Sequence, residues 1–411
     1  MNKRMDRSKL NIGTYRLQKY ARTEAHIRDL REGGIDFVIG MDSTDTATLD
    51  LMAKYGVGCV VNDVLPGWWG GSGDKAGQLH KIIPMESYEA GAAAFRDHPA
   101  IWGVDIGDEP SALDFPYYGR VYSRVNTLFP NQLTYLNLYP NYASVAQNNV
   151  TETMSQLGTS TYAEHIAAYC EQVPADYLCY DFYVYNCRVP KMYENLQTVA
   201  DACRNTGRSM WIVLQVNSYR PEVFVSENQL RFQAYTAMAF GAEVITWACW
   251  TAGWWHNQVL DDKGERTEQY EKLKTVNAEL HALSEMYMKY RRTQTHFVGF
   301  AGTSWLEDPA QVSKDQADTG VFRAVRALDG APVVVGEMVG RKDADQKALF
   351  LAAADDPYDA HPQERTVSFR VDPERAVFAY SGQGQIPVAR DGDGICTVKL
   401  APCGGVLVTA N

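Results

Sequence analysis

The sequence lacks the patterns that mark several common kinds of site. Only 8 of its 411 residues are His, and no tight Cys-x-x-Cys or Cys/His spacing occurs, so nothing indicates a zinc site. A Gly-rich phosphate loop, a nucleophilic Ser elbow and a Cys/His pair are also missing. We therefore expect no bound metal and no cofactor.

Dense basic runs and long apolar runs are missing as well. The formal net charge is −11, which argues against nucleic acid or an anionic membrane as a partner. No stretch approaches the roughly 18 apolar residues that cross a bilayer. The charged start, residues 1–7, holds no apolar secretory segment, so we expect a cytoplasmic protein, although a secreted chain without its leader would look the same.

The 8 Cys fall mostly on expected strands and helices and are interpreted as small core residues of a reducing compartment. Disulfides between Cys179 and Cys187, or between Cys396 and Cys403, are the alternative. The sequence does not indicate an oligomeric state.

Short apolar strands alternate with helices from residue 10 to residue 290. The expected strands are 10–15, 36–41, 57–61, 101–106, 133–138, 176–183, 210–215 and 243–250. Eight such repeats predict a (β/α)8 TIM barrel over residues 1–292. A doubly wound open sheet is the alternative, and it is disfavoured because no G-x-G-x-x-G follows the first strand.

After Arg292 the pattern becomes one of strands and turns only. Strand-like segments recur up to residue 408, separated by turn residues such as Asp329-Gly330 and Asp391-Gly392-Asp393-Gly394. We expect a small all-β sandwich domain over residues 293–411 that carries no obvious chemistry of its own and packs on the barrel or covers an edge of the site.

The fourth strand ends in two consecutive carboxylates, Asp108 and Glu109. Pro110 cannot continue the ladder, so both acids lie where a buried strand meets a loop. In a parallel barrel that edge faces the ligand. The alternative is that the two acids only begin the next helix, but Ser111 and Asp114 are available as caps.

The expected ends of the other strands add acids, amides and flat aromatic rings. The candidate substrate-binding residues are Tyr15, Asp42, Asp63, Trp68, Trp69, Asn137, Tyr139, Tyr183, Gln215, Trp250, Trp254 and Trp255. Aromatic faces cover the C–H faces of pyranose rings, and amides and carboxylates bind hydroxyls, so this set favours a carbohydrate. Any one Trp would equally suit packing, but their clustering after strands three and eight favours a platform.

Several segments resemble the clan A glycoside hydrolases, namely Gly107-Asp108-Glu109-Pro110, Tyr180-Asp181-Phe182-Tyr183 and the aromatic strand eight. Residues 137–143 and 157–162 are similar to a group of bacterial hydrolase-like proteins with a trailing β-sandwich. Clan A enzymes are retaining (β/α)8 hydrolases with an acid/base Glu after strand four and a nucleophilic Glu after strand seven. The resemblance implies the acid/base role for Glu109.

The sequence departs from this family at two positions. Gln215 stands where the nucleophile is expected, and Asp108 stands where the clan usually has Asn. Asp181 is our first candidate for the second carboxylate, as an inverting base at about 6.5–9.5 Å from Glu109 or a nucleophile at about 5–5.5 Å. Glu222 or Glu227, after strand seven, is a second possibility, although Glu227 better suits a helix N-terminus.

Three functions fit the residues expected at the strand ends. The first is a glycoside hydrolase with Glu109 as general acid/base, Asp181 as its partner, and Asp108 raising the pKa of Glu109 by charge repulsion. The second is a carbohydrate-binding barrel without turnover, which would also explain Gln215. The third is a metal-assisted lyase or isomerase that binds a hard divalent ion through Asp42, Asp63 and Asp108.

Overall fold

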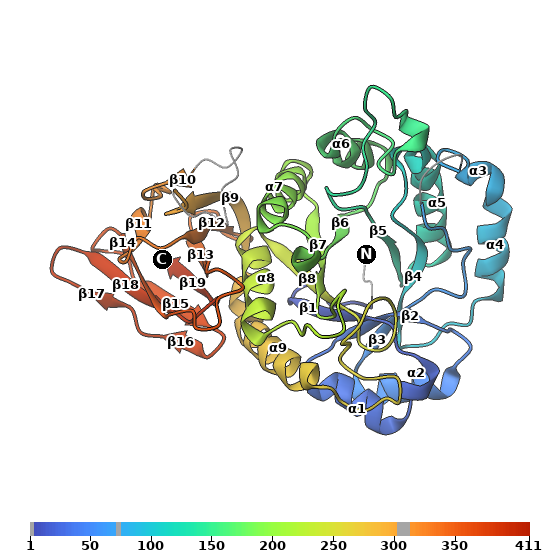
Figure 1. Cartoon of the computed structure of the whole chain (residues 1–411), viewed down its shortest axis with the longest axis horizontal. Helices are drawn as coiled ribbons and strands as arrows, with labels where there is room; N and C mark the ends of the chain where they lie inside the picture. The colour runs from blue at the N-terminus through green and yellow to red at the C-terminus, as the bar shows by residue number, and fades with distance from the viewer. Residues whose placement is uncertain (1–3, 71–74, 302–312) are drawn as a thin grey trace.

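The computed structural model describes residues 4–70, 75–301 and 313–411 (Figure 1). An 8-stranded parallel sheet curves into a barrel with the strand order β5-β4-β3-β2-β1-β8-β7-β6. Its strands are β1 Asn11–Tyr15, β2 Phe37–Met41, β3 Gly58–Val61, β4 Ile101–Asp108, β5 Leu133–Asn137, β6 Tyr177–Phe182, β7 Ser209–Gln215 and β8 Ala242–Ala248. The predicted (β/α)8 TIM barrel is therefore confirmed.

The barrel closes between β5 and β6 by a short contact just beyond β5. Leu138 forms an isolated parallel bridge with Tyr180, and its N–H donates to the carbonyl of Cys179 over 2.9 Å. Because the strands are parallel, their carboxyl ends meet at one mouth, where the loops carry side chains from different parts of the chain.

Helices surround the strands (Figure 1). They are α1 Glu24–Glu32, α2 Thr46–Tyr55, α3 Leu79–Ile82, α4 Met85–Ala94, α5 Phe115–Leu128, α6 Tyr162–Gln172, α7 Val189–Thr206, α8 Glu227–Ala239 and α9 Glu268–Tyr287. Their ends follow local sequence signals. The Asp45 side chain accepts from the N–H of Thr48 at the start of α2, and Ser226 and Gln229 form the capping box of α8.

The ends of α7 and α9 show how local and tertiary signals share the work. Helix α7 begins at Val189, because Pro190 fits the first turn, where its missing N–H costs nothing. Helix α9 ends at Tyr287, and the chain enters β9 (Tyr290–Val298) at once. The expected domain boundary after Arg292 thus falls inside β9.

The residues after α9 form two packed sheets, as expected for a β-sandwich. A 7-stranded sheet contains β9, β10 Ser313–Lys314, β12 Val333–Gly340, β13 Lys347–Ala353, β15 Val377–Ser381, β16 Gly384–Ile386 and β19 Gly405–Ala410. A 4-stranded sheet contains β11 Arg323–Ala327, β14 Arg365–Arg370, β17 Ala389–Arg390 and β18 Ile395–Leu400. Their facing side chains form a separate core that includes Leu349, Leu351 and Val408.

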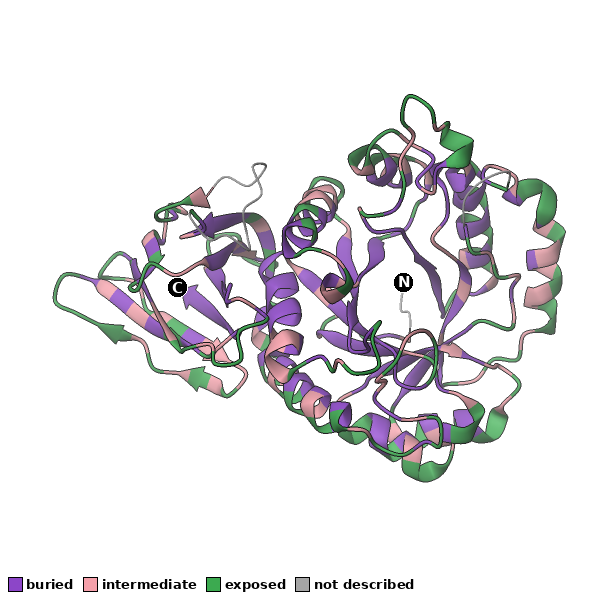
Figure 2. Ribbon diagram, in the orientation of Figure 1, coloured by how far each residue is buried: buried purple, intermediate pink, exposed green. Residues whose placement is uncertain are grey.

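The larger sheet also packs on the barrel through α8 and α9. From Phe232 to Ala239 every residue of α8 is buried, which Figure 2 shows as an almost continuous purple helix between the two bodies. A helix buried on all sides needs a second layer over its outer face, and the sheet supplies it. A Cβ on Gly336 would come within 2.2 Å of the Ala239 carbonyl oxygen, so only Gly allows this approach of β12 to α8.

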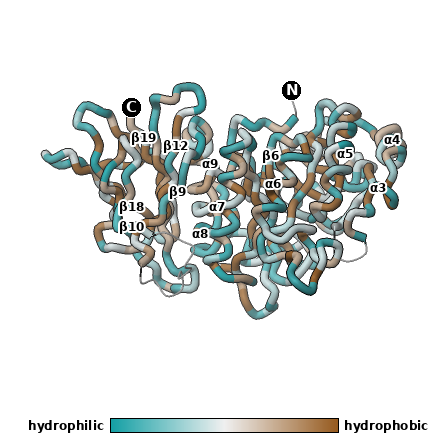
Figure 3. The backbone as a smooth tube through the Cα atoms, turned by 90° about the horizontal axis from the view of Figure 1, so that it is seen from above, coloured by the Kyte–Doolittle hydropathy of each residue, from teal (hydrophilic) through white to brown (hydrophobic). Residues whose placement is uncertain are grey.

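Viewed from above, the two bodies lie side by side, with hydrophobic segments running through the interior of each (Figure 3). Within the described residues, none of the helices has the length and apolar character needed to cross a bilayer. All eight cysteines are free thiols, so neither of the two disulfides considered above forms.

Candidate active site

The end of β4 is held by the loop that follows β3. Trp69 forms a parallel bridge with Asp108, whose N–H donates to the Trp68 carbonyl over 2.7 Å, while the Gly70 N–H donates to the Asp108 carbonyl over 2.9 Å. A Cβ on Gly70 would meet the Glu109 carbonyl oxygen at 1.8 Å, so the contact requires Gly. Glu109 itself has φ +47°, a left-handed conformation that a non-Gly residue keeps only when its surroundings impose it.

The same loop fixes the Glu109 side chain. The indole N–H of Trp69 donates to Glu109 Oε2 over 2.6 Å, from a ring that is 59% exposed at the mouth. The other side of Glu109 faces β6, where its carboxyl group hydrogen-bonds to the carboxyl group of Asp181. Two carboxyls form such a bond only when one of them carries a proton.

Asn137, at the end of β5, connects two of the acids. Its amide nitrogen donates to Asp181 Oδ1 over 2.8 Å and to Asp108 Oδ1 over 3.1 Å. Its amide oxygen accepts from the Cys179 thiol at 3.4 Å, which fixes the orientation of the amide. Strands β4, β5 and β6 thus place Asp108, Glu109 and Asp181 in one hydrogen-bonded group.

Burial and charge repulsion favour the protonated forms of these acids. Burial raises the pKa of Glu109, and the negative charges of Asp181 and Asp108 raise it further. Burial also raises the pKa of Asp181, while the hydrogen bonds from Asn137 and Glu109 oppose this shift. The bond between the two carboxyls raises the pKa of Glu109 and lowers that of Asp181, so the proton resides on Glu109.

Two adjoining cavities open at this group. The first, which we call the carboxyl cavity, has a volume of about 210 Å³ and is lined by Tyr15, Asp108, Glu109, Asn137, Asp181, Tyr183, Val213, Trp254 and Trp255. The second, the tryptophan cavity, has a volume of about 260 Å³ and is lined by Tyr15, Arg16, Ile39, Gly40, Asn62, Gly67, Trp68, Trp69, Asp105, Gly107, Asp108, Tyr135 and Trp254. Together they fall in the size range of small-molecule sites.

Aromatic rings form one wall of the carboxyl cavity. The ring of Tyr183 meets that of Trp255 edge-on at 4.7 Å between centroids, and Trp254 meets Tyr15 at 5.7 Å. Edge-to-face packing of this kind holds the rings in place. Acids on one side and fixed aromatic rings on the other give the cavity two chemically different walls.

Ten of the predicted site residues therefore come together at the two cavities, and five do not. Gln215 is fully buried, and its side-chain amide is hydrogen-bonded to neighbouring backbone groups. The amide oxygen accepts from the Tyr185 N–H over 3.0 Å, and the amide nitrogen donates to the Asn217 carbonyl over 3.0 Å. Val213, two residues earlier on β7, lines the carboxyl cavity instead. Gln215 therefore contacts neither cavity.

The other four residues have structural contacts elsewhere. Trp250 is fully buried and packs on Tyr270, and Tyr139 lies in a small buried cluster with Leu157. Asp42 accepts from Arg22 over 2.8 Å. Asp63 accepts from the Ser43 N–H over 2.8 Å. Strand-end position alone did not distinguish these residues from those that line the cavities.

Glu222 and Glu227 also lie away from the carboxyl cavity. Glu222 is exposed, with Arg220 at 3.8 Å, and Glu227 forms an ion pair with Arg231 at 2.7 Å on the first turns of α8. Among the described residues no cluster of three or more His, Cys, Asp or Glu side chains could hold a metal ion. The metal site considered for Asp42, Asp63 and Asp108 is therefore not formed.

Among the lining residues that were not predicted, Asp105 on β4 and Tyr135 on β5 carry polar groups. Burial raises the pKa of Asp105 to about 7, partly offset by its bond from the Gly107 N–H. The Tyr135 hydroxyl hydrogen-bonds to that of Tyr15 over 2.6 Å. A charged residue in the middle of an otherwise apolar strand is a usable signal, because carboxylates are rarely buried without a reason. Tyr135 carries no such signal.

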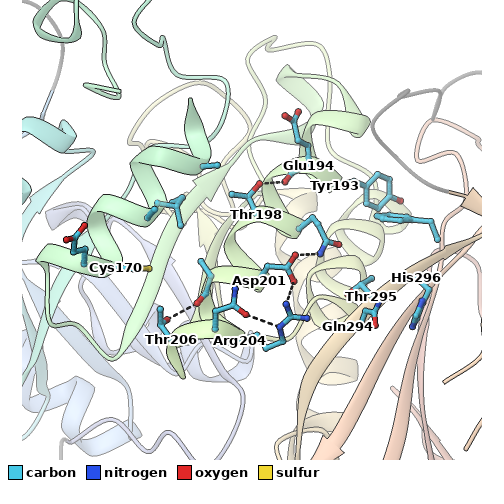
Figure 4. Close-up of a pocket in the computed structure, with 18 of the residues that line it drawn as sticks. Cys170, Tyr193, Glu194, Thr198, Asp201, Arg204, Thr206, Gln294, Thr295 and His296 are labelled. Atoms are coloured by element: carbon cyan, nitrogen blue, oxygen red, sulfur yellow. Dashed lines mark hydrogen bonds and ion pairs between the residues drawn. The ribbon is translucent and has the colours of Figure 1, made fainter. Parts of the chain in front are cut away.

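A larger cavity lies elsewhere. It has a volume of about 1160 Å³ and lies between α6, α7 and β9, lined by residues that include Cys170, Glu194, Asp201 and His296 (Figure 4). None of its lining residues borders the two mouth cavities. Asp201 is paired with Arg292 at 3.0 Å and Glu194 with Lys191 at 2.9 Å.

We expect the Trp69→Phe variant to have a higher Glu109 pKa than the wild type. The indole N–H stabilises the charged carboxylate, and its loss favours the protonated form, by up to about tenfold in the acid dissociation constant. The measurement is a ¹³C NMR titration of the Glu109 carboxyl. Trp68→Phe is the matched control, because the Trp68 N–H has no partner among the described residues. Equal titration curves for the two variants would contradict the assigned bond.

No family model and no curated protein matches the chain. Its structure is similar to that of a cycloisomaltooligosaccharide glucanotransferase from a Paenibacillus species, complexed with cycloisomaltoheptaose. That likeness has a TM-score of 0.57 and 9% sequence identity, and covers 98% of this chain and 85% of that one. Similarity extends to a glucosidase from Croceicoccus marinus (TM-score 0.46, 12% identity, covering 98% and 96%) and to xylanase 10B from Thermotoga maritima (TM-score 0.44, 10% identity, covering 66% and 95%).

The likeness to the glucanotransferase shows a shared fold. The likeness extends through the barrel and into the β-sheet region. It confirms the expected fold, a clan A-like (β/α)8 barrel followed by a β-sandwich.

Proposed function

We propose that this protein hydrolyses a glycosidic bond, with Glu109 as the proton donor and Asp181 as its partner. The observation that carries the proposal is the hydrogen bond between the Glu109 and Asp181 carboxyls at the floor of an aromatic-walled cavity. Glycoside hydrolysis needs a carboxylic acid that is still protonated near neutral pH, beside a second carboxylate.

The rest of the cavity supports a sugar as the substrate. The rings of Tyr183, Trp254 and Trp255 suit the apolar face of a pyranose, and the polar groups opposite suit its hydroxyls. The cycloisomaltooligosaccharide glucanotransferase shares only the fold with this chain, but its action on a glycan agrees with this proposal.

Binding without turnover is the competing function, because Gln215 replaces the expected nucleophile. Raising the pKa of Glu109 by burial serves proton transfer, but is of no use to a protein that only binds a neutral sugar. This favours hydrolysis over binding alone.

The test is a screen of the purified chain on aryl glycosides of both anomers and on oligosaccharides, with release of the aglycone or of reducing ends as the readout. We expect hydrolysis of at least one glycoside. Isothermal titration calorimetry with the same sugars is the companion measurement. Sugar binding with no turnover in any class would contradict the hydrolase and favour the binding protein.

A further inference from the structure

Proton donation by Glu109 assists the leaving group but supplies no nucleophile. As the leaving oxygen takes the proton, C1 of the sugar needs a nucleophile from the opposite face of the ring. Nothing that lines the carboxyl cavity on the β7 and β8 side offers one, because those residues are Val213, Trp254 and Trp255. Gln215 has its amide fully engaged and contacts neither cavity.

Asp181 is badly placed for that task. A nucleophilic carboxylate stands about 5–5.5 Å from the acid, and an inverting base stands about 6.5–9.5 Å away, so that a ring, or a ring and a water, fits between them. The Glu109 and Asp181 carboxyls hydrogen-bond directly, which leaves no room for either. Asn137 also holds Asp181 and Asp108 on that same side of the cavity.

We propose that the substrate brings its own nucleophile, and that the substrate class is a glycoside of a 2-acetamido-2-deoxy sugar. This inference rests on the proposed hydrolase function. A 2-acetamido group carries a carbonyl oxygen that reaches C1 from within the same sugar. Such intramolecular attack has an effective concentration that no external water matches, so the aromatic wall opposite the acids needs no carboxylate.

The first step balances as follows. The acetamido oxygen forms a bond to C1, the glycosidic C1–O bond breaks with its electron pair on the leaving oxygen, and that oxygen takes the proton of Glu109. The product is a positively charged oxazolinium ring fused to the sugar, and its N–H needs an acceptor. Asp108 borders both cavities and lies beside Glu109, so its carboxylate is the residue that accepts this N–H.

The second step returns the site to its starting state. Water attacks C1 and gives one proton to the Glu109 carboxylate, while the bond from C1 to the acetamido oxygen breaks and the amide re-forms. C1 is inverted twice, so the released sugar keeps its anomeric configuration. Asp181 receives the hydrogen bond of Glu109 before and after the cycle, and Asn137 is a positioning residue for both aspartates.

The experiment compares three matched sets of aryl glycosides with the intact chain. The first set carries a 2-acetamido group, the second a 2-hydroxyl group, and the third the mono-, di- and trifluoroacetamido groups. We expect the 2-hydroxyl sugars to react at least about a thousandfold more slowly. We also expect kcat/KM to fall with each added fluorine, because fluorine withdraws electrons from the attacking oxygen, and ¹H NMR to show retention of configuration.

Inhibition gives a second readout that needs no turnover. A thiazoline fused to the sugar at C1 and C2 mimics the oxazolinium ring, and calorimetry should show tighter binding than for the parent 2-acetamido sugar. The Asp108→Asn variant should lose this preference. The matched control is Asp63→Asn, the same substitution at an aspartate that borders neither cavity, and this variant should keep the preference.

The outcomes separate the inference from the function on which it rests. Comparable rates on 2-hydroxyl sugars, insensitivity to fluorine, or inversion of configuration would overturn substrate assistance and leave the hydrolase standing. Absence of hydrolysis on every set would contradict the hydrolase itself. Failure of the thiazoline to bind more tightly than the parent sugar would also count against substrate assistance.

Discussion

Replacing Glu109 with Gln should lower kcat/KM on substrates with poor leaving groups by about 10²–10⁴-fold. The amide keeps the size of the side chain and can still contact Trp69, but it has no acidic proton for the glycosidic oxygen. Substrates with very good leaving groups need less protonation and should lose less. The measurement is kcat/KM for a series of aryl glycosides whose leaving-group pKa values differ.

The wild-type pH profile belongs to the same prediction. Because the pKa of Glu109 is raised, the acid form persists through neutral pH, and the alkaline fall in rate should begin only where this proton is lost. Glu222→Gln is the matched control, an exposed glutamate in the loop after β7 that borders neither cavity. Full activity of Glu109→Gln, or a loss of similar size in Glu222→Gln, would show that the donor is misassigned.

Replacing Phe350 with Ala should destabilise the folded chain by about 3–5 kcal/mol. Phe350 is fully buried on β13, where its ring stacks over Tyr235 of α8 and meets Tyr287 of α9 edge-on at 5.4 Å between centroids. Truncation leaves a cavity between the barrel and the larger sheet of the sandwich, which cannot collapse without moving both. The measurement is the free energy of unfolding from denaturant titration, together with calorimetry.

The control for this prediction is Phe378→Ala. Phe378 lies on β15 in the same sheet but is 37% exposed, so its removal should change the free energy of unfolding by no more than about 0.5 kcal/mol. Similar losses in the two variants would show that the contact between sheet and barrel contributes little. A separate low-temperature transition in Phe350→Ala would show that the sandwich unfolds alone.

The alternating part of the fold was predictable because its signals are local. The apolar strands lie close to their expected ranges, and capping residues such as Ser226 fix helix starts within one turn. The boundary at the end of α9 was not predictable from local signals. Amphipathic spacing continues past Tyr287, and the strand that follows, β9, is defined by its pairing with β12, a distant segment of the chain. The buried outer face of α8 is also set by tertiary packing, which no local pattern encodes.

The site was predictable to the extent that strand ends in a barrel converge. This placed Asp108, Glu109 and Asp181 at one mouth, but could not give their separation, which depends on hydrogen bonds among side chains. Trp250 and Tyr139 show the limit of the argument, since a residue just beyond a strand can turn into the protein interior as readily as toward the ligand. The role of Trp69 was visible only as an aromatic residue in a loop, because its bond to Glu109 depends on a bridge to β4.

The surroundings of Gln215 bear on how such a site can change during evolution. Its amide nitrogen donates to the Asn217 carbonyl over 3.0 Å and to the Asn186 side-chain oxygen over 3.3 Å, and both partners are acceptors. A glutamate there would set a buried negative oxygen against these two acceptors, and among the described residues no Lys or Arg hydrogen-bonds to this side chain. A charged carboxylate at residue 215 would therefore require changes in its neighbours as well, so the hydrogen bonds around this position favour an amide.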